Sequence, residues 1–130
     1  AIIGQRLVRR IHEDCKEIDV LALEVQQRVD AIIALLPEDE RKVREGKPVQ
    51  FWKGKGCDAC HGTGLKGRVG IYEIFTMSKE IEAIILSEKV SEYQMQELAV
   101  KQGMVTMVQD GILKALDGIT SVDEVFSVAE

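Results

Sequence analysis

Apolar residues gather in three short segments that have the pattern of β-strands. The first, Ile2 to Ile11, mixes apolar with basic residues, and the second, Val49 to Trp52, has the pattern of a short strand. The third, Arg68 to Phe75, is rich in β-branched and aromatic residues, which favour strands. Six of the eleven glycines lie between Gly54 and Gly70. This density of glycine predicts tight turns with positive φ, as a small metal-binding knuckle requires.

The segment from Val20 to Leu36 has helical periodicity instead. Its apolar residues recur every three or four positions along one stripe, and Pro37 ends the pattern. The next ten residues, Glu38 to Lys47, are nearly all charged, and we expect a solvated loop or a frayed helix end there.

Four further helices are predicted in the last part of the chain. Serines that can cap a helix precede three of them, and the last of these serines is followed by a glutamate at capping-box spacing. A glycine suited to a left-handed C-terminal position closes the second helix. The third is expected from Met107 to Leu116. The residues that cap or close these helices are Ser78, Ser91, Gly103, Ser121 and Glu124.

These elements predict an α+β fold. Residues 1–76 would form a small zinc-knuckle region with short strands and one inserted helix. Residues 77–130 would form a C-terminal helical subdomain. A length of 130 residues suits one domain, or one small domain with an appendage.

The composition narrows the classes of function. Hydrophobic residues make up 45% of the chain and charged residues 30%, which is ordinary for a globular protein and argues against a wholly disordered one. The formal net charge is -5, whereas a general nucleic-acid binder would more often be basic, so we expect no nucleic-acid partner. No apolar run approaches the roughly 20 residues that span a bilayer, so we expect no membrane insertion.

The number of cysteines and the first residues of the chain predict the cellular compartment. The chain has three cysteines, and an odd number is a poor disulfide framework. It opens without a signal-peptide pattern, so we expect a cytoplasmic protein. It also opens without an initiator methionine, which fits a piece of a longer protein.

Two ligand pairs indicate a structural zinc site. His12 and Cys15 form a His-x-x-Cys pair, and Cys57 and Cys60 form a Cys-x-x-Cys pair. A gap of two residues lets a tight turn aim both side chains at one ion, about 2.3 Å from each sulfur. Four such ligands would complete a tetrahedron and leave no open position, so the site would be structural rather than catalytic.

Other interpretations of these residues are open at the level of sequence. His61 directly follows Cys60 and is the rival fourth ligand, although His12 restores the two-residue gap. Cys57 to His61 also matches the haem attachment pattern Cys-x-x-Cys-His, but haem would leave Cys15 unexplained. A thioredoxin-like redox pair would need a helix that starts just after its first cysteine, and glycines follow here instead.

The stretch from Gly62 to Gly67 satisfies the pattern Gly-x-Gly-x-x-Gly. A dinucleotide site needs a strand before this pattern and a helix after it, but here a cysteine knuckle precedes it and a strand is predicted to follow. The phosphate-loop pattern also fails, because Arg68 and Val69 stand where lysine and serine or threonine are needed. The chain contains no recognisable ATP site and no hydrolytic triad, so we expect no catalysis by this chain alone.

Several segments together resemble one family. Ala1 to Arg10, followed by a ligand-x-x-Cys-Lys unit that ends at Lys16, resembles the opening of the cysteine-rich region of type II secretion and type IV pilus assembly ATPases. Gly56 to Ile74 resembles that family's second cysteine pair and the strand after it. Gly103 to Thr120, continued by Ser121 to Phe126, resembles its terminal helices.

The resemblance implies a function that the residues alone do not. Members of the family are hexameric, RecA-like ATPases that power pilus assembly or protein export from the cytoplasmic side of the inner membrane. This chain would be a zinc-stabilised C-terminal structural region, and the Walker motifs, ATP and magnesium would belong to the upstream part of the parent protein. Its partners would be neighbouring subunits of a homo-hexamer and assembly platform proteins of the inner membrane.

The sequence departs from the family pattern at two positions. The family usually has four cysteines, and His12 stands at the first of these positions, which implies a site of one histidine and three cysteines. The last helix of the family often carries an arginine near the position of Ser127, and that arginine is absent here.

The alternative function is a free-standing zinc-knuckle module that binds other proteins. One copy of the Cys-x-x-Cys-x-Gly-x-Gly repeat of DnaJ-type chaperones is present, where those chaperones carry four.

Overall fold

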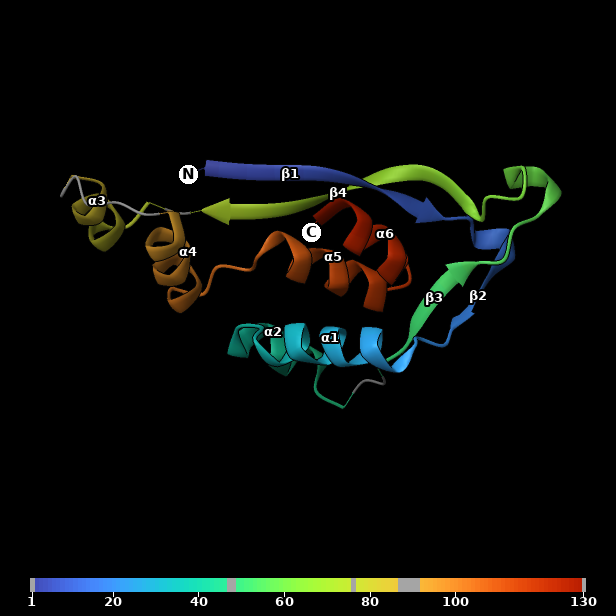
Figure 1. Cartoon of the computed structure of the whole chain (residues 1–130), viewed down its shortest axis with the longest axis horizontal. Coiled ribbons are helices and arrows are strands. Elements are labelled where there is room, and N and C mark those ends of the chain that lie inside the picture. Colours follow the sequence, from blue (N-terminus) through green and yellow to red (C-terminus); the bar gives the residue numbers. More distant parts are fainter. Residues whose placement is uncertain (1, 47–48, 76, 87–91, 130) are drawn as a thin grey trace.

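The fold is α+β, as predicted. The structure is a computed structural model that describes residues 2–46, 49–75, 77–86 and 92–129 (Figure 1). Within these residues the chain forms two separate two-stranded antiparallel sheets and six α-helices. The longest helix of this part has 12 residues, and no helix in it is long and apolar enough to cross a bilayer.

A long antiparallel ribbon of β1 (Ile2–Ile11) and β4 (Leu65–Phe75) runs along the molecule (Figure 1). β1 has the bounds that the sequence predicts, and β4 begins three residues earlier than predicted. Val8 and Ile71 are buried on the face of the ribbon that packs against the helices. Leu7, next to Val8, is exposed, because successive side chains of an extended chain point to opposite faces.

A second, shorter sheet pairs β2 (Lys16–Asp19) with β3 (Phe51–Gly54). β3 lies two residues further along the chain than the predicted strand. The sequence does not predict β2, because its residues have no apolar run and form a strand only by pairing with β3. Phe51 is buried in the core and anchors this sheet to the helices.

The charged segment after Pro37 is a helix, where we expected a loop or a frayed helix end. α1 (Leu23–Ala34) is followed by α2 (Glu38–Arg44). Acidic residues occupy the first turn of α2 and basic residues its last turn, an arrangement that complements the helix dipole. Arg44 also donates to the carbonyl oxygen of Leu113 (3.2 Å) and to Asp117 (3.0 Å), which fastens the end of α2 to the body of the molecule.

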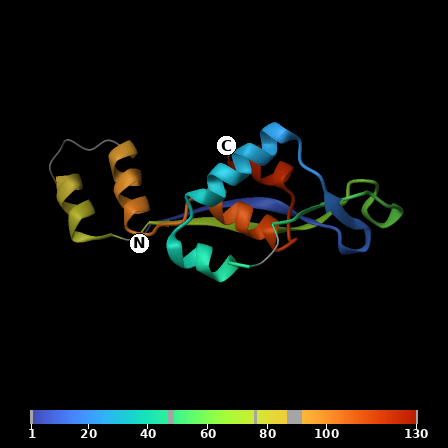
Figure 2. The same ribbon diagram turned by 90° about the horizontal axis from the view of Figure 1, so that it is seen from below.

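Helices α3 (Lys79–Leu86) and α4 (Glu92–Lys101) form a hairpin at one end of the molecule (Figure 2). The Ser78 hydroxyl accepts the N–H of Ile81 (3.2 Å), so the predicted cap is confirmed. Ser91, the predicted cap of the next helix, lies outside the described residues. Gly103 has a φ of 94° and closes α4 in a Schellman motif, with Met104 N–H bonded to the carbonyl of Ala99.

Helix α5 (Met107–Leu116) has the predicted bounds and is followed by α6 (Val122–Ala129). The predicted capping box of α6 is only half formed. The Ser121 hydroxyl accepts the N–H of Glu124 (3.2 Å), but the Glu124 carboxylate turns to Arg9 of β1 instead of returning to Ser121. There it meets a charged partner and a strand N–H that would otherwise lack an acceptor.

The core lies between α1, β3, α5 and α6. Its buried residues are Val29, Phe51, Ile112, Ala115, Val122 and Val125. This core takes side chains from both sides of position 76, so residues 1–76 and 77–130 pack on each other. Whether the second segment also folds as a subdomain by itself stays a prediction.

Candidate metal centre

The four predicted ligands lie on two short 3₁₀ turns. His12 directly follows β1 and precedes the turn Glu13–Cys15, and Cys57 precedes the turn Asp58–Cys60. A 3₁₀ helix has three residues per turn, so side chains at positions i and i+3 point to the same side. Each two-residue gap in the sequence therefore presents its two ligand atoms together.

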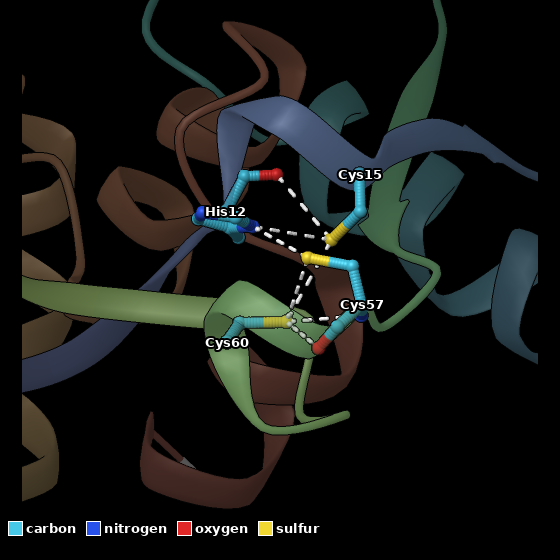
Figure 3. A group of neighbouring side chains, drawn as sticks. All are labelled: His12, Cys15, Cys57 and Cys60. Carbon is cyan, nitrogen blue, oxygen red and sulfur yellow. Dashed lines mark hydrogen bonds between the residues drawn. The ribbon is translucent and has the colours of Figure 1, made fainter.

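The two turns face each other and bring all four ligand atoms within 4.8 Å of one another (Figure 3). His12 Nδ1 lies 3.4 Å from the sulfurs of both Cys15 and Cys57. The Cys60 sulfur lies 3.5 Å from that of Cys57 and 3.9 Å from that of Cys15. A tetrahedral zinc ion would hold sulfurs about 3.8 Å apart. The donor set and its spacing therefore fit one closed, four-coordinate ion.

The two histidines are in different environments. His12 is buried, its Nδ1 faces the sulfurs, and its Nε2 lies 3.7 Å from a carboxylate oxygen of Asp14. An acceptor on the far side of a ligating imidazole commonly fixes which nitrogen binds the metal. His61 is exposed, has a left-handed backbone (φ 56°), and is not in the group. The structure thus groups the four residues proposed from spacing, and metal binding by them stays a prediction.

Backbone N–H groups converge on the Cys60 sulfur. Cys57 N–H and Gly64 N–H both donate to it, each at 3.2 Å. Burial alone would raise the pKa of the Cys60 thiol, but these two N–H groups and the neighbouring thiols outweigh burial and lower the pKa to about 6. A lowered pKa favours the thiolate, the form that binds a metal. The pKa of Cys15 is raised instead, chiefly by burial.

Glycines allow two stretches of backbone to cross directly behind the ligands. A Cβ at Gly54 would lie 1.9 Å from the carbonyl oxygen of Gly64, and a Cβ at Gly56 would lie 2.7 Å from that of Gly62. No side chain can occupy such a contact. Gly62, Gly64 and Gly67 also have the positive φ that the sequence predicted, so the Gly-x-Gly-x-x-Gly stretch shapes the knuckle.

Other residues join the knuckle to the helices. Ile11 N–H donates to the carbonyl of Ile119 (2.9 Å). The Lys16 ammonium lies 5.2 Å from the centre of the Trp52 ring and packs where a side chain at Gly118 would stand. These roles of Lys16 and Trp52, and that of Asp14 beside His12, were not predicted from the sequence. Nothing in their local sequence marks them, because their contacts are made with residues distant in the chain or with the metal ligands.

The comparisons with known proteins agree on one family. Residues 1–127 match the family model described as "Type II/IV secretion system protein". The chain is 37% identical to the "Type IV pilus assembly ATPase PilB" of Thermus thermophilus, in a match that covers 97% of this chain and 13% of that protein. It is 33% identical to the "Type IV pilus assembly ATPase TfpB" of Acinetobacter baylyi, with 98% and 20% covered. It is 30% identical to the "Type II secretion system protein E" of Aeromonas hydrophila, with 98% and 23% covered. The chain therefore spans less than a quarter of the length of these relatives.

Proposed function

This chain belongs to the type II/IV secretion system protein family, and on that premise we propose that it is the zinc-stabilised C-terminal structural region of a secretion or pilus-assembly ATPase. The parent protein would be a hexamer that binds ATP and magnesium in the part outside this chain and powers pilus assembly or protein export. This chain would contribute structure and not catalysis.

One observation carries the zinc part of the proposal. One imidazole and three sulfurs converge with tetrahedral spacing, and backbone N–H groups already stabilise one sulfur as a thiolate. Zinc accepts this donor set and this geometry. The ion would bridge the end of β1 to the loop that leads into β4, and it would supply folding free energy to a region rich in glycine and poor in large apolar residues.

The names of the relatives support the rest of the proposal. Two are named as pilus assembly ATPases and one as a secretion system protein. By that similarity the parent would act in the cytoplasm, held at the inner membrane through partners. These partners would be neighbouring subunits of the hexamer and assembly platform proteins of the inner membrane.

Metal analysis tests the zinc centre. Protein purified without added metal should carry about one zinc per chain, measured by plasma mass spectrometry. Cys57→Ser and His12→Ala should lose it. His61→Ala is the matched control, because His61 is an exposed histidine outside the group, and it should keep the zinc. Normal zinc content in Cys57→Ser, or loss in His61→Ala with retention in His12→Ala, would contradict the assignment.

The genomic sequence tests the parent protein separately. The reading frame before Ala1 should encode a Gly-x-x-x-x-Gly-Lys-Ser/Thr phosphate loop. In parallel, a fluorescent ATP analogue with magnesium should show no saturable micromolar binding to the 130-residue chain. A reading frame that begins at this chain would refute the parent ATPase and favour the free-standing module, whatever the metal analysis shows.

A further inference from the structure

The three cysteine sulfurs of the candidate metal centre lie close enough to react with one another. The Cys60 sulfur is 3.5 Å from that of Cys57 and 3.9 Å from that of Cys15 (Figure 3). All three cysteines are free. Sulfurs in a disulfide are about 2.0 Å apart, so Cys57 and Cys60 need to approach by only about 1.5 Å to form one. The cluster is therefore suited to disulfide chemistry as well as to metal binding.

The local backbone favours the pair of Cys57 and Cys60. The 3₁₀ turn Asp58–Cys60 begins directly after Cys57 and places both sulfurs on one side. The N–H groups of Cys57 and Gly64 both donate to the Cys60 sulfur at 3.2 Å, which holds that sulfur beside Cys57. A bond between Cys57 and Cys60 would close a small ring within this turn. A bond between Cys15 and Cys60 would instead join two turns that are 45 residues apart in the sequence, so it depends on their relative position.

The sulfurs differ in their access to solvent. Cys60 is only 6% exposed, whereas Cys57 and Cys15 are half-buried. A small oxidant would therefore reach Cys57 or Cys15 first, and the buried Cys60 would attack the oxidised sulfur. If Cys15 reacted first, exchange with the closer Cys57 would transfer the bond to the local pair and return Cys15 to a thiol. Both routes end at the same disulfide.

We propose that Cys57 and Cys60 are a site of reversible oxidation by hydroperoxides, and that their disulfide releases the metal. The release of the metal rests on the proposed function, in which these two residues are zinc ligands. Hydroperoxides oxidise accessible cysteine thiolates to sulfenic acids, which condense with a neighbouring thiol to a disulfide that other thiols can reduce. The three-residue turn is shorter than the helix of a thioredoxin-like enzyme, so we assign the pair as a target of oxidation and not as a catalyst of disulfide exchange.

The reaction with hydrogen peroxide balances in two steps. The Cys57 sulfur attacks one oxygen, the O–O bond breaks, and the products are a Cys57 sulfenic acid and one water. The Cys60 sulfur then attacks the Cys57 sulfur, an S–S bond forms, and the hydroxyl group leaves as a second water. The two sulfurs together lose two electrons, and the peroxide gains them. Two thiols supply the two protons that complete these waters, and two zinc-bound thiolates would take them from the solvent instead.

Closing the disulfide would remove two of the four ligands. His12 and Cys15 would remain, and both come from the turn at the end of β1. Two ligands from one turn cannot bridge the end of β1 to the loop that leads into β4, so the zinc would leave and the knuckle would loosen. The hydrogen bond from His12 N–H to the Gly64 carbonyl (2.9 Å) needs no metal and would remain. The oxidant would thus act on the knuckle through its metal.

Peptide mapping of the 130-residue chain tests the choice of partners. Trypsin leaves Cys57 and Cys60 together in residues 56–66 and Cys15 in residues 11–16. After treatment with hydrogen peroxide, free thiols are blocked with N-ethylmaleimide before digestion. Residues 56–66 should lose the mass of two hydrogens and stay unlabelled, residues 11–16 should carry the label, and dithiothreitol should reverse the change. A main product that links the two peptides, or sulfinic acid in residues 56–66, would overturn the proposal.

Zinc release and a matched variant complete the test. A metal indicator should report one zinc released for each disulfide formed in residues 56–66. In metal-free protein, Cys15→Ser should form this disulfide at a rate within a few fold of the unaltered chain, because the local pair is intact. A loss of rate of about tenfold or more would show that Cys15 is required, against the proposal.

The outcomes separate this proposal from the proposed function. Zinc that stays bound while peroxide is in excess would refute the oxidation site and leave the zinc centre standing. Protein that carries no zinc before treatment would refute the zinc centre and the metal release with it. The disulfide in residues 56–66 of that metal-free protein would still decide whether Cys57 and Cys60 are an oxidation site.

Discussion

Alanine substitutions should distinguish two roles of glycine in the knuckle. One role is to allow a left-handed backbone, and the other is to allow two stretches of backbone to cross closely. Gly62 and Gly64 both have left-handed backbones, with φ of 78° and 73°. Alanine at either position costs about 1–2 kcal/mol in backbone strain. Around a Cβ at Gly62 there is nothing within 4 Å, whereas a Cβ at Gly64 would lie 2.5 Å from the carbonyl oxygen of Gly54. Gly62→Ala is therefore a matched control for Gly64→Ala.

The size of the effect follows from the geometry. Restoring an ordinary separation of 3.4 Å would require the backbones of Gly54 and Gly64 to move apart by about 0.9 Å. Gly64 N–H donates to the Cys60 sulfur, and the Gly64 carbonyl accepts the N–H of His12 (2.9 Å). A shift of that size would break or lengthen both bonds and misplace two ligands. Loss of such supporting contacts typically costs about 10- to 100-fold in metal affinity.

Zinc affinity can be measured by competition with a chromophoric chelator at pH 7, and the fold can be checked by circular dichroism. We expect Gly62→Ala to bind zinc within a few fold of the unaltered chain. Gly64→Ala should bind it about 10- to 100-fold more weakly than Gly62→Ala. Equal affinities for the two variants would refute the idea that the glycine crossing positions the ligands.

Four other predictions concern stability and metal release. Glu124→Ala should lower the thermal midpoint by roughly 5 °C, because it removes the acceptor of Arg9 N–H, and Glu124→Gln should lower it less. Gly111→Ala should destabilise the chain by about 1–3 kcal/mol in urea, because its Cβ would meet a valine of α6 at 2.6 Å, although alanine normally favours a helix. In the metal-free chain the pKa of Cys60 is lowered to about 6, so its thiolate is present at higher pH and is lost as the pH falls through 6; protons then compete with zinc, and zinc release, followed with a metal indicator, should rise as the pH falls further below 6. Chelation of the metal should raise amide hydrogen exchange first in residues 57–67, while the amides of α5 and α6 stay protected. Simultaneous loss of protection in both regions would show that the chain unfolds as one cooperative unit.

Local signals in the sequence determined several elements of this protein. The bounds of α5 and the closure of α4 at Gly103 depend on capping residues within a few positions, so they can be read without the rest of the fold. The same holds for the two ligand pairs, since a gap of two residues and a single 3₁₀ turn place each pair on one side. Positive φ in the glycine-rich stretch is equally local.

Pairing between distant segments decided other elements. β2 consists of residues with no strand pattern of their own and exists because it lies against β3. The Glu124 side chain was predicted to close a capping box, yet it bonds to Arg9, which is distant in sequence. The backbone of Ser121 and the charged Arg9 compete for the Glu124 carboxylate. The sequence does not show that Arg9 lies within hydrogen-bond distance of Glu124 in the fold, so it predicts only the local bond.

The meeting of the two ligand pairs was also decided by the tertiary structure. Spacing predicted His12 with Cys15 and Cys57 with Cys60, and it left His61 as a rival to His12. The β1–β4 ribbon and the β2–β3 sheet bring the two turns together, and they leave His61 exposed on a left-handed turn. The sequence by itself thus determined which side chains share a turn, because that depends on neighbouring dihedral angles. Only the tertiary structure decided which turns come together at the candidate metal centre, because that depends on strand register and on glycine contacts between segments far apart in the chain.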